Sequence, residues 1–232
     1  MKGQFLWNQD ALIRHMFNKL DYYVVLTDID KKQLKEIYNV DVTRIYNPCS
    51  FKIENKSKLN SKTFLAVGRL EKVKGFDKLI EAFYYFSKKN NEWNLKICGS
   101  GSEKNNLENL IDKYNLSDRI FIEPFSNNIK NAYIDSNVFL FTSIKEGFGL
   151  VLLEAMEAGL PIIAFDLPCV HEILDLNSSI IVEYLNVVDL SNSMLELIKD
   201  DKQMKFMSKN GIEHVKRFDG KNIVNEWIKL LK

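Results

Sequence analysis

The sequence has 232 residues, of which 46% are hydrophobic and 27% charged, and its formal net charge is +1. This balance is ordinary for a globular protein, and the length suits one good-sized domain with an appendage. The charge gives no global field for nucleic acid, so no nucleic-acid partner is predicted, while a local basic patch stays open. Three scattered cysteines and three separated histidines indicate reduced thiols and argue against a zinc site.

No part of the sequence indicates passage through a membrane. No apolar run reaches the roughly 20 residues that a spanning helix needs. The first 17 residues lack the continuous apolar segment of a secretory signal. A cytoplasmic location is therefore expected, and peripheral contact with the inner face of a membrane stays open.

The first 62 residues predict short elements followed by a connection. Helices and strands are expected at residues 11–19, 22–26, 30–38 and 42–46. Asp28 or Asp30 is expected to cap the helix at 30–38, because a carboxylate there can accept from free N–H groups. The lysine-rich residues 52–62 predict a linker or an exposed loop.

After residue 62 apolar strands alternate with helices. Strands are predicted at residues 63–67, 95–98, 119–122, 138–141, 161–165 and 179–182. Helices are predicted at residues 75–88, 103–114, 129–135, 150–158, 188–199, 202–217 and 221–231. This rhythm predicts an α/β fold, a Rossmann-like parallel sheet with helices on both faces. Such sheets bind ligands beyond the carboxyl ends of their strands, so the loops there are the candidate sites.

The loop after the first of these strands carries two cations, Arg69 and Lys74, between Gly68 and Gly75. A guanidinium offers a planar fork to phosphate oxygens, and an ammonium adds a point charge. The helix after this loop adds free N–H groups and a positive dipole end. The loop therefore favours a phosphate site, and a lysine-rich surface turn is the alternative.

The next loop, Gly99-Ser100-Gly101, comes after another strand. Glycines let a backbone come close to a ligand. The dinucleotide fingerprint is incomplete, because Lys104 stands where its third glycine would be. A tight strand-to-helix turn explains this loop equally well.

The loop after residue 141 holds the sharpest pattern, with Glu146 in the loop and Glu154 on the next helix. A carboxylate accepts two hydrogen bonds side by side, which suits vicinal hydroxyls. The N–H groups of residues 147–150 would face anionic oxygens at the helix start. The alternative is an acid that only favours the helix dipole or lies on a solvated face, and Glu157 is assigned to that class.

Together the stretches VGRLEKVKGFDKLIEAF, LKICGSG and FTSIKEGFGLVLLEAMEAGLPIIAF resemble the donor domain of glycosyltransferase family 4. The resemblance covers about residues 20 to 230. It implies the two-domain GT-B fold and a retaining transfer from a UDP- or GDP-sugar to a glycan or lipid-linked acceptor, as in polysaccharide biosynthesis. It also implies no metal and no other cofactor, because cationic side chains would neutralise the leaving diphosphate.

The resemblance also implies roles for single residues. Arg69 and Lys74 would hold the diphosphate, Glu146 would contact the transferred sugar, and Glu154 the ribose hydroxyls. Backbone groups that line the donor pocket would come from Gly68, Gly99, Gly101, Gly147, Phe148, Gly149 and Leu150.

The resemblance divides the chain into three parts. Residues 1–48 would be a remnant of the amino-terminal acceptor domain, residues 49–218 the donor domain, and residues 219–232 a helix that crosses back. Three explanations of the short first part stay open: a fragment, a truncated reading frame, or half of a split enzyme with its amino-terminal domain on a separate chain. Residues 122–125 (IEPF) depart from the family's glycine, which leaves the base preference open.

Other motifs have simpler explanations. Asp28-Ile29-Asp30 spells a manganese-binding pattern of another glycosyltransferase class, but helix capping explains it better. His171-Glu172 fits a loop or helix start, and His15 and His214 are expected to be structural or exposed. Two other functions are also considered. A non-catalytic sugar-nucleotide-binding module stays open, whereas a nicotinamide-dependent dehydrogenase would lack its glycine fingerprint.

Overall fold

A computed structural model describes residues 20–125 and 128–232. The helix expected at residues 11–19, and His15 within it, lie outside the described residues. Among the described residues, no helix is long and apolar enough to cross a bilayer.

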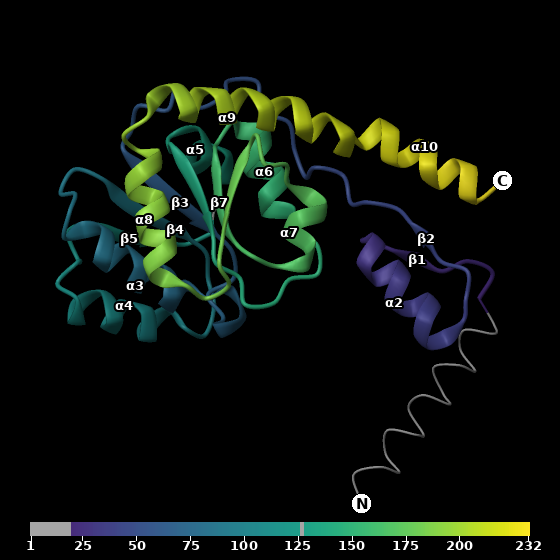
Figure 1. Ribbon diagram of the computed structural model, residues 1–232, viewed down its shortest axis with the longest axis horizontal. Coiled ribbons are helices and arrows are strands. Elements are labelled where there is room, and N and C mark those ends of the chain that lie inside the picture. The colour runs from purple at the N-terminus through teal and green to yellow at the C-terminus, as the bar shows by residue number, and fades with distance from the viewer. Residues whose placement is uncertain (1–19, 126–127) are drawn as a thin grey trace, which may run out of the picture.

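A six-stranded sheet forms the centre of the molecule (Figure 1). Its strands are β3 (Thr63–Val67), β4 (Asn94–Cys98), β5 (Ile120–Glu123), β6 (Val138–Phe141), β7 (Ile162–Phe165) and β8 (Ser179–Val182). They lie in the order β5-β4-β3-β6-β7-β8, and every neighbouring pair is parallel. The predicted parallel sheet is confirmed. The chain direction across the sheet reverses between β3 and β6, which is where such folds bind ligands.

Helices cover both faces of this sheet (Figure 1). They are α3 (Phe76–Ser87), α4 (Lys104–Lys113), α5 (Ile129–Ile134), α6 (Leu150–Ala158), α7 (Pro168–Ile173), α8 (Val187–Leu197) and α9 (Asp201–His214), whereas α10 (Gly220–Leu230) extends beyond the sheet (Figure 1). Successive strand side chains point to opposite faces. Phe64 accordingly joins the core under α3, α4 and α8, and Leu65 the core under α5, α6 and α7.

Three short helical features were not predicted. Two are 3-10 helices, η1 (Lys72–Lys74) and η2 (Val215–Phe218), and the second ends the helix expected to run to residue 217. The third is α7, which begins with Pro168 in its first turn, a position where the missing N–H costs nothing. Six residues are too few to show a helical period.

Residues 20–48 form a small two-stranded unit outside the main sheet, with β1 (Val24–Val25), α2 (Asp28–Tyr38) and β2 (Thr43–Arg44). The two strands pair in parallel. The unit contacts α10, because Arg44 lies 3.7 Å from Glu226. Figure 1 shows α10 extending from the core above this unit.

The cap of α2 differs from the prediction. Thr27, not Asp28 or Asp30, is the N-cap, and its hydroxyl accepts from the Asp30 N–H at 3.0 Å. Thr27 has the extended backbone that an N-cap needs, whereas both aspartates already lie in the first helical turn. Their carboxylates favour the positive end of the helix dipole there.

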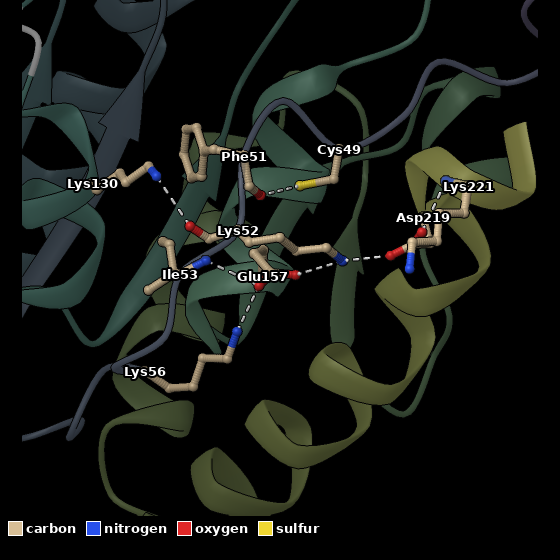
Figure 2. Close-up of polar contacts among 9 residues, drawn as sticks. All are labelled: Cys49, Phe51, Lys52, Ile53, Lys56, Lys130, Glu157, Asp219 and Lys221. Carbon is tan, nitrogen blue, oxygen red and sulfur yellow. Dashed lines mark hydrogen bonds and ion pairs between the residues drawn. The ribbon is translucent and has the colours of Figure 1, made fainter. Parts of the chain in front are cut away.

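The expected exposed loop at residues 52–62 is in part anchored (Figure 2). Ile53 is buried, and its N–H donates to Glu157 at 3.1 Å. Lys56 pairs with the same oxygen at 2.7 Å, and Lys52 bridges Glu157 at 3.7 Å and Asp219 at 3.0 Å. Glu157 is only 5% exposed, so its assignment to the solvated or dipole class is wrong. The lysines of residues 52–62 make this stretch look solvent-exposed in the sequence. The acid that neutralises Lys52 and Lys56, Glu157, lies about 100 residues later and could not be paired with them from the sequence.

Candidate active site

The loops after β3 and β6 meet where the sheet order reverses. The Ile144 N–H donates to the Val73 carbonyl at 2.8 Å, and the Thr142 hydroxyl donates to the Lys74 carbonyl at 3.2 Å. Gly75 makes this approach possible, because its φ is +64° and a Cβ there would lie 2.1 Å from the Thr142 oxygen. The two loops are therefore held as one unit.

Lys74 and Glu146 form an ion pair between these loops. The ammonium lies 2.6 Å from Glu146 Oε2, and each side chain is 17% exposed. Ser143 Oγ is 3.4 Å from the same oxygen, and the Gly147 N–H donates to Oε1 at 3.2 Å. The structure thus brings together two residues that the sequence placed 72 positions apart. Glu146 faces a cation in the site, not open solvent.

Arg69 lies on the same loop as Lys74 but is exposed. Its neighbour Glu71 is bound to the next loop, accepting from the Ser102 N–H at 3.3 Å and the Ser102 hydroxyl at 2.9 Å. These hydrogen bonds lower the pKa of Glu71, and the positive charge of Arg69 lowers it further. Within residues 20–125 and 128–232, the guanidinium has no hydrogen bond or ion pair, so its fork is available to a ligand.

Gly99 and Gly101 bring the loop after β4 against the loop after β3. A Cβ on Gly99 would lie 1.9 Å from the Gly68 oxygen, and one on Gly101 would lie 2.4 Å from the Leu70 oxygen. The Leu70 N–H donates to the Ser100 carbonyl at 2.9 Å between them. These glycines therefore have a packing role, which the tight-turn alternative anticipated. Contact with a ligand stays a prediction.

This packing predicts opposite results for two glycine substitutions. We expect Gly99→Ala to destabilise the fold by about 1–3 kcal/mol, because a backbone oxygen must move to admit the methyl group. Gly147→Ala should leave stability unchanged, since nothing lies within 4 Å of its added Cβ. Urea unfolding of both variants measures the difference. Equal stability of the two variants would contradict the packing role.

Glu154 has a partner that the sequence did not reveal. The Tyr133 hydroxyl, on α5, donates to Glu154 Oε2 at 2.7 Å. Tyr133 is fully buried, and burial first, then the Glu154 charge, raises its pKa well above the usual range. The hydroxyl therefore stays protonated and fixes one carboxylate oxygen. No local pattern marked Tyr133, which precedes Glu154 by 21 residues.

Phe148 connects the candidate site to the amino-terminal unit. Its side chain is 4% exposed, and its ring centroid lies 6.0 Å from that of Tyr46 and 6.2 Å from that of Phe218. The helix α6 begins two residues later, after Gly149 with φ +89°. The buried ring leaves only the backbone of Phe148 for contact with a ligand, and such contact stays a prediction for residues 147–150.

Glu172, His171 and His214 have partners outside the Lys74–Glu146 pair. Glu172 accepts from the Asp28 N–H at 2.7 and 2.9 Å, which ties α7 to α2. His171 Nε2 lies 2.6 Å from Asp166 Oδ1, and both side chains are exposed. His214 is half-buried, with Nε2 3.0 Å from the Ile173 oxygen, a structural position as expected.

Comparison with known proteins identifies similar chains. An uncharacterized glycosyltransferase of Haemophilus influenzae is 33% identical over 211 residues, which are 89% of this chain and 60% of that protein. The poly(ribitol-phosphate) alpha-N-acetylglucosaminyltransferase of Staphylococcus aureus is 27% identical over 98% of this chain and 47% of its own length. The chain thus spans about half the length of these relatives.

A solved structure has the same fold. A point mutant of the S. aureus protein TarM, in complex with fondaparinux, alpha-GlcNAc-glycerol and UDP, superposes with a TM-score of 0.86 at 23% identity. The match covers 96% of this chain and 46% of TarM. Residues 50–214 also match the family model described as glycosyl transferases group 1. This match takes in the sheet, the Lys74–Glu146 pair and Glu154, and the chain therefore belongs to the glycosyl transferases group 1 family.

Proposed function

We propose that this chain binds a UDP- or GDP-sugar and serves in a retaining, metal-independent transfer of a hexose or N-acetylhexosamine, as in glycosyltransferase family 4. The acceptor is a glycan or a lipid-linked glycan. The observation that carries the proposal is the Lys74–Glu146 pair, 2.6 Å apart at the point where the strand order reverses. A cation held by an acid at that point suits a donor that is anionic at one end and rich in hydroxyls at the other.

In this proposal the leaving diphosphate is stabilised by fixed positive groups. Lys74 has three donors, so it contacts a phosphate oxygen while Glu146 keeps it in place. Arg69 adds its fork, and the N–H groups at the start of α6 face the negative oxygens. The acceptor hydroxyl attacks the anomeric carbon from the side on which the diphosphate leaves, and the diphosphate takes up the hydroxyl proton. Glu146 positions the sugar and forms no covalent bond.

We also propose a division of labour along the chain. Residues 49–218 hold the donor, and residues 1–48 with the crossing helix at 219–232 belong to the acceptor side. The contact of Arg44 with Glu226 supports this division, because it joins the small amino-terminal unit to the crossing helix. The packing of Tyr46 on Phe148 supports it too, because it sets that unit against the donor loop.

A thermal-shift screen tests the donor proposal. A ligand that binds only the folded state raises the melting temperature, by an amount that grows with its concentration over Kd. We expect UDP- or GDP-sugars to raise it and NAD to leave it unchanged. A shift with NAD alone would replace the proposal with a dehydrogenase.

A second candidate function is a sugar-nucleotide-binding module without transfer. It is favoured because the residues proposed to hold the donor, among them Lys74, Glu146 and Glu154, all lie within residues 50–214, the part that matches the family model. Calorimetry and then an assay of sugar release and transfer separate the two functions. Binding without turnover identifies a module or half of a split enzyme, and turnover by this chain alone identifies an enzyme.

Arg69→Lys tests the role of the guanidinium fork. We expect donor affinity to fall about tenfold, because a point charge does not reproduce a bidentate contact. The side chain is exposed, so the melting temperature of the free protein should not change. Calorimetry with the donor found by the screen gives the affinity, and an unchanged value would remove Arg69 from the site.

Tyr133→Phe tests whether Glu154 binds ribose hydroxyls. Losing the hydroxyl frees the carboxylate from its fixed orientation, and we expect donor affinity to fall about fivefold for one hydrogen bond. Discrimination between ribose and deoxyribose donors should fall with it. Tyr114→Phe is the control, since Tyr114 stacks on Tyr84 away from Glu154. Lower stability with unchanged discrimination would make Tyr133 only a core residue.

A further inference from the structure

A groove lies at the edge of the sheet opposite the candidate active site. It consists of two cavities of about 440 and 320 Å³ that share Leu59 in their walls. The walls include Asn60, Trp93 and Asn137, which come just before β3, β4 and β6. The candidate active site lies beyond the carboxyl ends of β3 and β6, so the groove is a different site.

The groove is strongly basic although the whole chain has a net charge of only +1. The lysines that line it are Lys56, Lys58, Lys62, Lys89, Lys199, Lys205 and Lys209. Its three acids are Glu92, Asp201 and Glu213, and two of these pair with Lys62 and Lys216 at 2.6 and 2.7 Å. Among the described residues, five of the lining lysines have no ion pair: Lys58, Lys89, Lys199, Lys205 and Lys209.

One wall of the groove, residues 56–62, is held in a fixed shape. The Ser57 N–H donates to the Ala158 carbonyl at 2.9 Å, and the Ser61 N–H donates to Asn137 Oδ1 at 2.9 Å. Leu59 and Lys62 have φ of 53° and 52°, a left-handed conformation that side chains disfavour. Such strain persists only where surrounding contacts impose it, and it is common at binding sites. Lys58 is thus carried on a rigid wall.

The opposite wall is α9, where Lys205 and Lys209 lie one helical turn apart. Like charges at this spacing repel each other, so the free protein is less stable for having them. An anion bound between the walls relieves this repulsion. The clustered lysines are therefore unfavourable in the empty groove and favourable when an anion occupies it.

We propose that this basic groove binds an extended polyanion, a chain that carries phosphate or carboxylate groups at intervals. Lysines on both walls and along two adjoining cavities fit several charges in a row better than one. A flat anionic membrane is a poorer fit to a concave surface. A nucleic acid is also disfavoured, because the one aromatic lining residue, Trp93, is 5% exposed and offers no face for base stacking.

The test compares two triple variants of the full chain with the same change of charge. Lys58, Lys205 and Lys209 are replaced by glutamine in one, and Lys32, Lys35 and Lys113, exposed on α2 and α4, in the other. The probe is inorganic polyphosphate, titrated at several salt concentrations. The logarithm of the binding constant falls linearly with the logarithm of the salt concentration. The slope is about 0.7–0.9 for each charge that the protein neutralises.

We expect the wild-type chain and the α2/α4 variant to bind polyphosphate equally. The groove variant should bind at least tenfold more weakly, with a salt slope lower by about 2–3. Equal loss in both variants would show nonspecific attraction and overturn the proposal. So would no binding by the wild-type chain, or tighter binding to anionic phospholipid vesicles or to a single-stranded oligonucleotide than to polyphosphate. A melting temperature of the groove variant that is no lower than that of the wild-type chain excludes misfolding as the cause.

Discussion

Lys74→Ala should lower sugar transfer by about 10²–10³-fold, the largest effect expected of any substitution in the candidate site. The variant loses the cation that would neutralise the leaving diphosphate. It also leaves Glu146, which is 17% exposed, beside the negative phosphates without a partner. Repulsion from this carboxylate adds to the lost attraction. Donor binding and transfer should therefore both decline.

The measurement is transfer from the donor that the thermal-shift screen identifies, with whatever polypeptide completes the site. Lys72→Ala is the matched control, because Lys72 lies on the same 3-10 helix, is exposed, and changes the charge by the same amount. Its activity should stay within about twofold of the wild type, since an exposed charge interacts only weakly through high-dielectric solvent. Equal loss in the two variants would reduce the Lys74 effect to a general loss of positive charge.

Glu146→Gln separates the two members of the pair. The amide keeps the size of the carboxylate and loses its charge, so Lys74 is no longer held and the sugar loses an acceptor. We expect transfer to fall nearly as far as in Lys74→Ala, and the double variant to be little worse than either single one, because the residues act as a unit. Full activity of Glu146→Gln would end the assignment of Glu146.

Glu157→Ala should have the largest effect on stability, about 2–4 kcal/mol. The substitution removes the acceptor of the buried Ile53 N–H and the partner of Lys56 and Lys52 (Figure 2). The lysines recover part of the loss by turning to solvent, which keeps the value below that of a fully buried pair. Urea unfolding of the whole chain gives the free energy.

Two further variants make the Glu157 prediction specific. Glu196→Ala, on the exposed surface of α8, should change stability by less than about 0.5 kcal/mol. Glu157→Gln keeps an oxygen for Ile53 and should lie between the other two. If Glu157→Ala lowered the free energy of unfolding no more than Glu196→Ala, the contacts of Glu157 with residues 52–56 would not stabilise the fold.

The fold could be read from the sequence because its signals are local. The strands at 63–67, 138–141 and 179–182 have the predicted bounds, since each is a short apolar run between clear breaks. The meeting of Lys74 and Glu146 was also expected, because both lie beyond strands of one parallel sheet. Their roles in binding stay predictions.

The contacts between distant segments could not be read in this way. Tyr133 reaches Glu154 from another helix, and Glu157 collects its partners from residues 52–56 about 100 positions earlier. Each partner alone looks like an ordinary surface or core residue. Glu157 is buried because residues 52–56 pack over the side of α6 on which it lies. Those residues show no hydrophobic periodicity, so the sequence does not predict where they pack.

The aromatic trio of Tyr46, Phe148 and Phe218 has a mechanical consequence. Packed rings resist compression and move together, so a shift of the loop at Gly147 is passed to the neighbouring rings. Tyr46 lies directly after β2 of the small amino-terminal unit, and Phe218 lies just before the start of α10. A displacement of Phe148 would therefore have to be accommodated both by the amino-terminal unit and by the start of α10.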